Sequence, residues 1–208
     1  MSPELLRNTV FVVISYLFGS IPFCFLIAKF KKKDLTKIGD QNPGGWNLAF
    51  SVSKFWGGVG ATLDILKGFL PFFLILKFTG SEVTAIIAGC AAIAGHDYSP
   101  FLKFSGGKGI ASLLGFLLAM NPFSIIAFGV GIVSVLFIAK NMIWGVVCGI
   151  IFACSFLVII NSPVYLLFGI FLLIIMIPKY INHSLPIWEN FQFRKEEKIK
   201  DLFTPKTR

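Results

Sequence analysis

Charged residues are scarce in this chain: of its 208 residues only 14% are Asp, Glu, Lys or Arg, whereas 56% are hydrophobic. A soluble domain carries roughly 25% charged residues. The apolar residues also come in blocks, several of them close to the roughly 20 residues that a helix needs to cross a bilayer. This composition excludes an ordinary soluble domain and predicts an all-α integral membrane protein.

Histidine and cysteine are also rare, which argues against a metal site. The chain has two histidines, His96 and His183, and four cysteines, all in apolar segments and with no Cys-x-x-Cys pair. We therefore expect no metal and no cofactor. The net charge of +9 comes without the basic and aromatic modules of nucleic-acid-binding domains, so no nucleic-acid partner is expected.

The apolar segments predict about seven transmembrane helices, at residues 6–30, 58–78, 83–96, 109–120, 122–139, 142–160 and 163–178. Residues 48–56 are predicted to form a short interfacial helix. The segments 83–96 and 109–120 give helices of only roughly 20 Å, against a hydrocarbon core of roughly 30 Å. They are expected to flank a polar phosphate-binding loop that lies partway into the membrane. A five-span arrangement, with 83–120 as a re-entrant pair, is the alternative; it fits the distribution of charge equally well, and we favour seven spans.

The distribution of positive charge predicts the orientation in the membrane, because Lys and Arg collect in cytoplasmic loops. With the N-terminus outside, only Arg7, Lys67 and Lys77 among the 19 basic residues lie away from the inner face. Residues 1–188 then form a multi-pass membrane domain. Residues 189–208 form a charged cytoplasmic tail, which we expect to lie on anionic lipid headgroups.

The sequence Gly106-Gly107-Lys108-Gly109 directly precedes a predicted helix. Helix N-termini offer unpaired N–H groups and a partial positive charge to anions, and glycines allow the backbone to approach a phosphate closely. The segment is not a Walker A loop, because Leu102 replaces the first glycine and no Ser or Thr follows Lys108. The alternative interpretation is a flexible cytoplasmic turn.

Two further polar segments are candidates for substrate binding. Asn42, Gly44 and Asn47 lie in the loop predicted to be cytoplasmic, where amides can bind hydroxyl or phosphate oxygens; a turn with a helix cap is the alternative. Ser20 precedes Ile21-Pro22 within the first span. Its alternative role is to satisfy backbone groups at a proline kink.

Ionisable residues inside apolar segments form a third group of candidates, because such residues are costly in a membrane and usually functional. Asp64 and Lys67 are three residues apart and therefore share a helix face. His96 ends a short helix near the glycine loop and could act as a general base or a phosphate ligand. A structural ion pair and a structural histidine are the alternatives.

Taken together, these segments resemble the bacterial acyl-phosphate:glycerol-3-phosphate acyltransferase family (PlsY). The resemblance covers about the first 120 residues, with the motifs in the same order. They are Gly19-Ser20-Ile21-Pro22, Asn42-Pro43-Gly44 with Asn47, Leu63-Asp64-Ile65-Leu66-Lys67-Gly68, and Gly95-His96 followed twelve residues later by Lys108.

The resemblance implies transfer of a fatty acyl group from acyl phosphate to the sn-1 hydroxyl of glycerol 3-phosphate. The products are lysophosphatidic acid, used in phospholipid biosynthesis, and inorganic phosphate. It also implies a bacterial inner-membrane protein of about seven helices, with a cytoplasmic site and membrane lipids around it. The residues implied as catalytic are His96 and Lys108. Those implied in substrate binding are Ser20, Asn42, Gly44, Asn47, Asp64, Lys67, Gly106, Gly107 and Asn182. The acceptor hydroxyl could lose its proton to substrate phosphate or to His96.

The chain departs from the family pattern on the side expected to hold the acceptor. Asp40, Trp46 and Phe50 stand where the family has Ser, Thr and Arg, and the C-terminal Arg-His-x-x-Asn has become Pro178-Lys179-Tyr180-Ile181-Asn182. Loss of an arginine removes a bidentate phosphate contact, and an added carboxylate repels phosphate. Two alternatives follow: a paralogue with a different acceptor, or a non-catalytic membrane transporter of a phosphate ligand.

Overall fold

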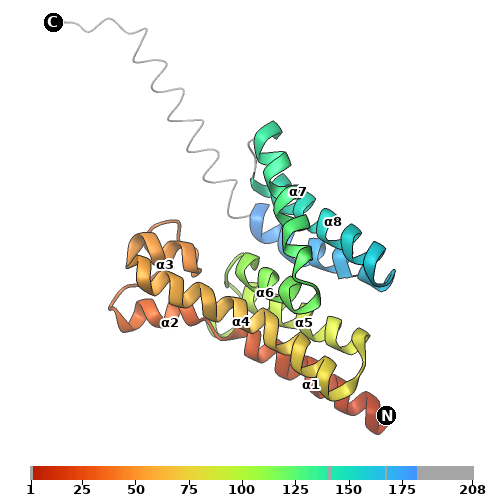
Figure 1. The fold of residues 1–208 in the computed structure, drawn as a ribbon. Helices are drawn as coiled ribbons and strands as arrows, with labels where there is room; N and C mark the ends of the chain where they lie inside the picture. The colour runs from red at the N-terminus through yellow and green to blue at the C-terminus, as the bar shows by residue number, and fades with distance from the viewer. Residues whose placement is uncertain (1, 140–141, 167, 182–208) are drawn as a thin grey trace, which may run out of the picture.

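The protein is all-helical in the computed structural model, which describes residues 2–139, 142–166 and 168–181 (Figure 1). The predicted tail 189–208 and Asn182 lie outside the described residues. The labelled elements are α1 (Pro3–Ser20), α2 (Phe23–Phe30), α3 (Gly45–Ser51), α4 (Lys54–Thr79), α5 (Glu82–Asp97), the 3-10 helix η1 (Pro100–Leu102), α6 (Ile110–Met120), α7 (Phe123–Ala139) and α8 (Met142–Ile160). A further helix, Val164–Ile181, follows α8.

Four helical spans among the described residues are long and apolar enough to cross a membrane. They are Pro3–Phe30, which comprises α1 and α2, then Lys54–Thr79, Ile143–Ile160 and Val164–Ile181. The helices α5, α6 and α7 are shorter. The predicted class, an all-α integral membrane protein, is confirmed. The count of seven spans stays a prediction, since α5 and α6 have 16 and 11 residues and span only about 24 and 17 Å.

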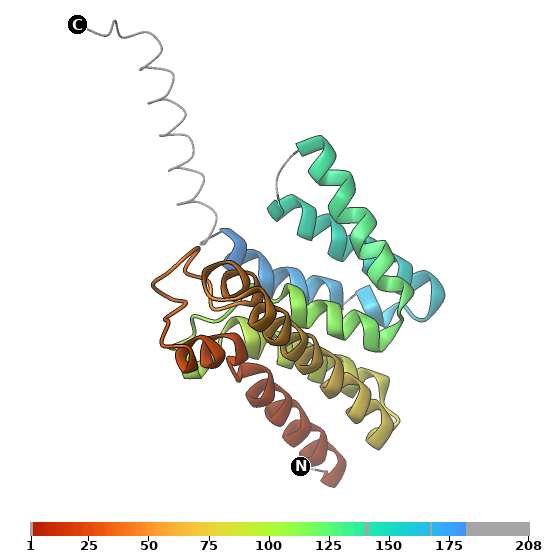
Figure 2. The ribbon, with the colours of Figure 1, turned by 60° about the vertical axis from the view of Figure 1, so that its left-hand side comes forward.

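The first half of the chain forms a bundle in which α1 packs along α5, and α4 packs against both α5 and α6. The helices α7 and α8 form a hairpin beside this bundle (Figures 1 and 2). Small residues bring the bundle helices close together. A Cβ on Gly19 would lie 2.1 Å from the carbonyl oxygen of Ala92, and one on Gly68 would lie 1.8 Å from that of Ser112. Larger side chains at either glycine would force the helices apart.

The predicted first span is broken at Ile21 and Pro22. The helix α1 ends at Ser20 and α2 begins at Phe23, because proline has no N–H to donate and its ring clashes with the preceding turn. The break leaves the Ile21 carbonyl available to a side chain. Two predicted boundaries also differ: α4 begins at Lys54 rather than at residue 58, and the short helix expected at 48–56 is α3.

Candidate functional site

A polar cavity of about 370 Å³ lies where three separate parts of the chain meet. The loop before α3 contributes Asn42, the glycine loop contributes Gly106, Gly107 and Lys108, and the last described helix contributes Lys179. Four of these five residues were predicted from the sequence as site residues. Their convergence supports the prediction that the glycine loop belongs to a functional site.

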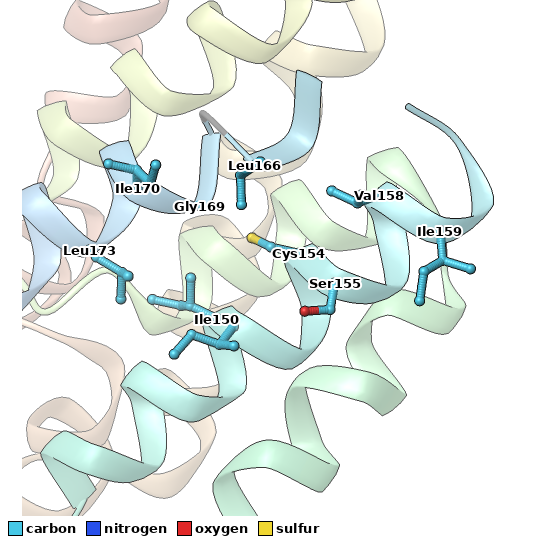
Figure 3. A pocket seen from close by; sticks show the side chains of 10 residues that line it. Ile150, Cys154, Ser155, Val158, Ile159, Leu166, Gly169, Ile170 and Leu173 are labelled. Carbon is cyan, nitrogen blue, oxygen red and sulfur yellow. The ribbon is translucent and has the colours of Figure 1, made fainter. Parts of the chain in front are cut away.

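A second cavity, of about 400 Å³, differs in chemistry. It lies between α8 and the helix Val164–Ile181 and is lined almost entirely by aliphatic side chains, with Cys154 and Ser155 the exceptions (Figure 3). Gly169 faces Cys154, where an added Cβ would lie 2.6 Å from the sulfur. None of the described residues that line this cavity is charged, so we look for the chemistry of a charged substrate in the polar cavity instead.

The glycine loop is attached to the end of α5 by backbone hydrogen bonds. The N–H of Gly106 donates to the carbonyl oxygen of Asp97, and the N–H of Gly107 donates to that of His96, both at 3.0 Å. A Cβ on Gly106 would lie 2.0 Å from the His96 oxygen, and one on Gly107 would lie 2.1 Å from Nε2 of His96. These two glycines are therefore required by close packing, and their amides are already used.

The amides available to an anion lie slightly further along the chain. Gly109 caps α6 in the left-handed region (φ +74°), and the first hydrogen bond of this helix runs from the Leu113 N–H to the Gly109 oxygen. Within the described part of the chain, the N–H groups of residues 110–112 have no acceptor. This is the expected state of a first helical turn. It is also the arrangement that binds anions at helix N-termini.

Lys108 lies at the cavity with an acidic neighbour. Its Nζ is 3.8 Å from Oδ2 of Asp40, and the two side chains are 24% and 28% exposed. Partial burial lowers the pKa of Lys108 below the usual lysine value, and the Asp40 carboxylate offsets part of that shift. Asp40, which the family pattern places on the acceptor side, thus lies beside the glycine loop, and the two side chains partly neutralise each other.

The loop before α3 is held in place by the side chain of Asn47. Its Nδ2 donates to the carbonyl oxygens of Leu35, Ile38 and Asn42, at 3.1, 2.9 and 3.0 Å, and its Oδ1 accepts from Ser51 at 2.7 Å. Asn47 is buried and does not line the cavity. In the structure, the Asn47 side chain holds the loop in place by hydrogen bonds and does not contact the cavity.

Asn42 lines the cavity, and Gly44 lies two residues further along the same loop. The N–H of Asn42 donates to Oδ1 of Asp40 at 3.2 Å, which forms a local turn of the kind that Asp favours. Gly44 is the N-cap residue of α3, and an added Cβ there would lie 3.0 Å from Nδ2 of Asn42. Asn42 thus faces the cavity, while Gly44 leaves room for its side chain.

A buried polar network lies behind the glycine loop. Nζ of Lys67 donates to the Ile21 oxygen at 2.6 Å, lies 2.8 Å from Oδ1 of Asp64 and lies 3.3 Å from Nδ1 of His96. The Cys24 thiol donates to Oδ2 of Asp64 at 3.2 Å. The helix break thus supplies one carbonyl that satisfies a charge buried within the bundle.

The contact between Lys67 and His96 bears on the tautomer of the histidine ring. With Lys67 protonated, Nδ1 of His96 is an acceptor, so the ring proton of a neutral imidazole is on Nε2. Nε2 lies beneath Gly107. In that tautomer, His96 presents an N–H donor to the underside of the loop.

Ser20 and two of the altered family positions, Trp46 and Phe50, do not line the cavity. The Ser20 hydroxyl donates to the Tyr16 oxygen at 2.7 Å, and the Ser20 carbonyl accepts from Ser99 at 2.6 Å. Trp46 and Phe50 are 72% and 66% exposed, and their ring centroids are 4.5 Å apart. The position where the family pattern has Arg therefore faces outward here, and its side chain does not line the polar cavity.

The cavity residues that were not predicted as site residues include Tyr98 and Lys179. Tyr98 comes directly after His96 and Asp97, which end a predicted helix, so the sequence already indicated that it lies near the site. Lys179 follows an apolar span, where a lysine is ordinarily interpreted as an orientation signal. The family pattern had already pointed to this stretch as the altered motif Pro178-Lys179-Tyr180-Ile181-Asn182, without naming Lys179 as a site residue.

The arrangement matches known proteins both in sequence and in structure. A family profile described as glycerol-3-phosphate acyltransferase matches residues 9–190. The chain belongs to the glycerol-3-phosphate acyltransferase family. Relatives of that name include the protein of Thermosipho melanesiensis, 39% identical over 76% of this chain and 78% of the relative. Another is the protein of Aquifex aeolicus, 35% identical over 76% of this chain and 82% of the relative.

Solved structures of the acyltransferase PlsY share the fold of this family member. The glycerol 3-phosphate form of PlsY has a TM-score of 0.77 and 28% identity, covering 88% of this chain and 93% of the PlsY chain. The lysophosphatidic acid form has a TM-score of 0.73 and the same identity, covering 86% and 92%. The sequence-based recognition of the PlsY family is confirmed.

Proposed function

We propose that the protein transfers a fatty acyl group from acyl phosphate to the sn-1 hydroxyl of glycerol 3-phosphate, giving lysophosphatidic acid and phosphate. One observation carries the proposal: Asn42, Lys108 and the glycine loop converge on one polar cavity. The forms of PlsY with glycerol 3-phosphate and with lysophosphatidic acid support this acceptor and this product. The donor is proposed from the chemistry of the loop, which suits a phosphate leaving group.

The donor phosphate is proposed to bind Lys108 and the first turn of α6. An acyl phosphate is an activated mixed anhydride, so catalysis needs mainly positioning and stabilisation of charge on the leaving phosphate. The amides of residues 110–112 and the Lys108 ammonium can supply that stabilisation. Gly106 and Gly107 hold the loop against α5, because their own amides donate to α5 carbonyls.

In the proposed reaction, the acceptor hydroxyl oxygen bonds to the acyl carbon as the bond from that carbon to the phosphate oxygen breaks. The hydroxyl proton leaves with a phosphate oxygen. Substrate phosphate suits this role better than His96, because Nδ1 of His96 lies 3.3 Å from Nζ of Lys67 and Nε2 lies beneath Gly107. We propose that His96, with Lys67 and Asp64, positions the glycine loop.

The proposal also places the cavity at the cytoplasmic face of a bacterial inner membrane, with the N-terminus outside. Lysines near the cavity end, such as Lys31, Lys32 and Lys33, are exposed, as the positive-inside rule requires. A phosphatase of the kind that is active only outside the cytoplasm, fused before Pro3, should be active. An inactive fusion would reverse the orientation.

The test is reconstitution of the purified protein with palmitoyl phosphate and glycerol 3-phosphate. We expect lysophosphatidic acid and inorganic phosphate in equal amounts, and loss of both in Lys108→Ala. Lys77→Ala, on an exposed position of α4, is the matched control. A Lys108→Ala variant with wild-type rate would disprove the assignment of the loop. Product from another phosphorylated alcohol alone would show a changed acceptor, and no product with any acceptor would favour the transporter.

A further inference from the structure

The carboxylate of Asp40 is held beside Lys108 by a fixed turn. The N–H of Gln41 donates to the carbonyl oxygen of Ile38 at 3.0 Å, which closes the turn around Asp40. Oδ1 of Asp40 accepts from the Asn42 N–H at 3.2 Å, and Oδ2 lies 3.8 Å from Nζ of Lys108. One oxygen of the carboxylate is thus anchored to its own loop, while the other lies next to the ammonium.

The turn that carries Asp40 is itself packed against a buried side chain. Gly39 lies in the left-handed region (φ +60°), and an added Cβ there would lie 2.0 Å from Oδ1 of Asn47. Nδ2 of Asn47 donates to the carbonyl oxygens of Ile38 and Asn42, one on each side of the turn. An ion pair between two mobile side chains contributes little, partly because both must be ordered. Here the loop has already ordered the Asp40 side of the pair.

The carboxylate neutralises a cation that the donor phosphate is proposed to use. Carboxylates and phosphates are both oxygen anions, and the same cationic side chains bind them. Lys108 lines the polar cavity, and Asp40 is not among the described residues that line it. A phosphate that enters the cavity therefore finds the charge of Lys108 partly neutralised, and the nearby carboxylate also repels it.

We propose that Asp40 sets how tightly the site holds phosphate, and that it promotes the departure of inorganic phosphate after acyl transfer. The inference rests on the proposed function and deepens it, because it names a residue that controls the release of a product. The donor has an acyl chain that stays in the apolar layer of the membrane, so it remains bound when its phosphate is held weakly. Inorganic phosphate has no such chain and dissociates.

The test is calorimetric titration of inorganic phosphate into wild type and Asp40→Asn, at a pH low enough for Lys108 to keep its proton. The variant is expected to bind phosphate about tenfold more tightly, because a repelling charge is removed from a partly buried site. An amide oxygen can still accept from the Asn42 N–H, so the turn is preserved. The matched control is Asp34→Asn, which removes a carboxylate 3.6 Å from Lys29 and should leave phosphate affinity unchanged.

A second measurement is inhibition of acyl transfer by added phosphate, whose inhibition constant should fall by the same factor in Asp40→Asn. A disturbed loop would weaken phosphate binding, so a purely structural role of Asp40 cannot produce the tighter binding. Unchanged or weaker binding of phosphate in the variant would overturn the inference, even if wild type were fully active. Tighter binding would support it even if wild type made no lysophosphatidic acid. If Asp40→Asn does not fold, Asp40→Ser, with the residue type of the family pattern, gives the same comparison.

Discussion

Nδ1 of His96 lies 3.3 Å from Nζ of Lys67, and this contact joins the end of α5 to the middle of α4. The same histidine accepts the Gly107 N–H at its carbonyl oxygen. One residue therefore connects the buried ion pair to the glycine loop. Changes in the pair are expected to affect the loop.

Lys67→Met should destabilise the protein strongly. The substitution leaves the buried Asp64 carboxylate without its cation, and breaking such a pair costs about 3 to 5 kcal/mol. Thermal unfolding in detergent measures the effect, with Lys77→Met on the same helix as control. The double variant Asp64→Leu/Lys67→Met should recover part of the loss. A single Lys67→Met variant as stable as Lys77→Met would contradict the importance of the network.

Gly106→Ala and Gly107→Ala should each lower kcat about tenfold or more, the result of displacing binding groups by a fraction of an ångström. An added Cβ would meet His96 atoms at 2.0 and 2.1 Å, so the loop must move off α5. The kcat for lysophosphatidic acid synthesis measures this. Gly58→Ala is the control, because a Cβ there has no atom within 4 Å. Wild-type rates for both loop variants would show that the close contact is unimportant.

Asp40→Asn should shift the alkaline limb of the pH–activity profile to lower pH. Burial lowers the pKa of Lys108 and Asp40 raises it, so removing the carboxylate lowers that pKa further. Lys108 then loses its proton, and with it phosphate binding, at a lower pH. The profile of kcat/KM measures the shift. The control is Asp34→Asn, which removes a carboxylate 3.6 Å from Lys29 and should leave the alkaline limb in place. If the alkaline limb of Asp40→Asn moved to higher pH, the prediction would be refuted.

Asn47→Leu should destabilise the loop before α3 by about 1 to 3 kcal/mol, the cost of buried carbonyls left unpaired. Because the Asn42 carbonyl is one of them, we also expect a higher KM for glycerol 3-phosphate. Unfolding midpoints and steady-state rates measure the two effects. Ser51→Ala removes a single bond to Asn47 and should have a smaller effect. If the two substitutions changed the unfolding midpoint and the KM equally, Asn47 would not be the main residue that holds the loop in place.

Much of the helical arrangement could be predicted from the sequence, because apolar segments, and the glycines and prolines that end them, are local signals. The helices α5 to α8, the glycine loop and the partnership of Asp64 with Lys67 follow from such signals. The use of the Gly106 and Gly107 amides does not, since it depends on how the loop meets α5. The place of Lys179 depends on the packing of the last described helix, far away along the chain.

The glycine loop is held on α5 by backbone hydrogen bonds, so the position of the loop does not depend on the side chains that determine which substrate binds. The Gly106 and Gly107 amides find their acceptors in main-chain carbonyls, which every residue type carries. Side chains around the cavity, such as Asp40, can change during evolution while the loop keeps its position. A new acceptor could thus arise by exchanging a few cavity-facing residues, with the membrane-embedded frame left as it is.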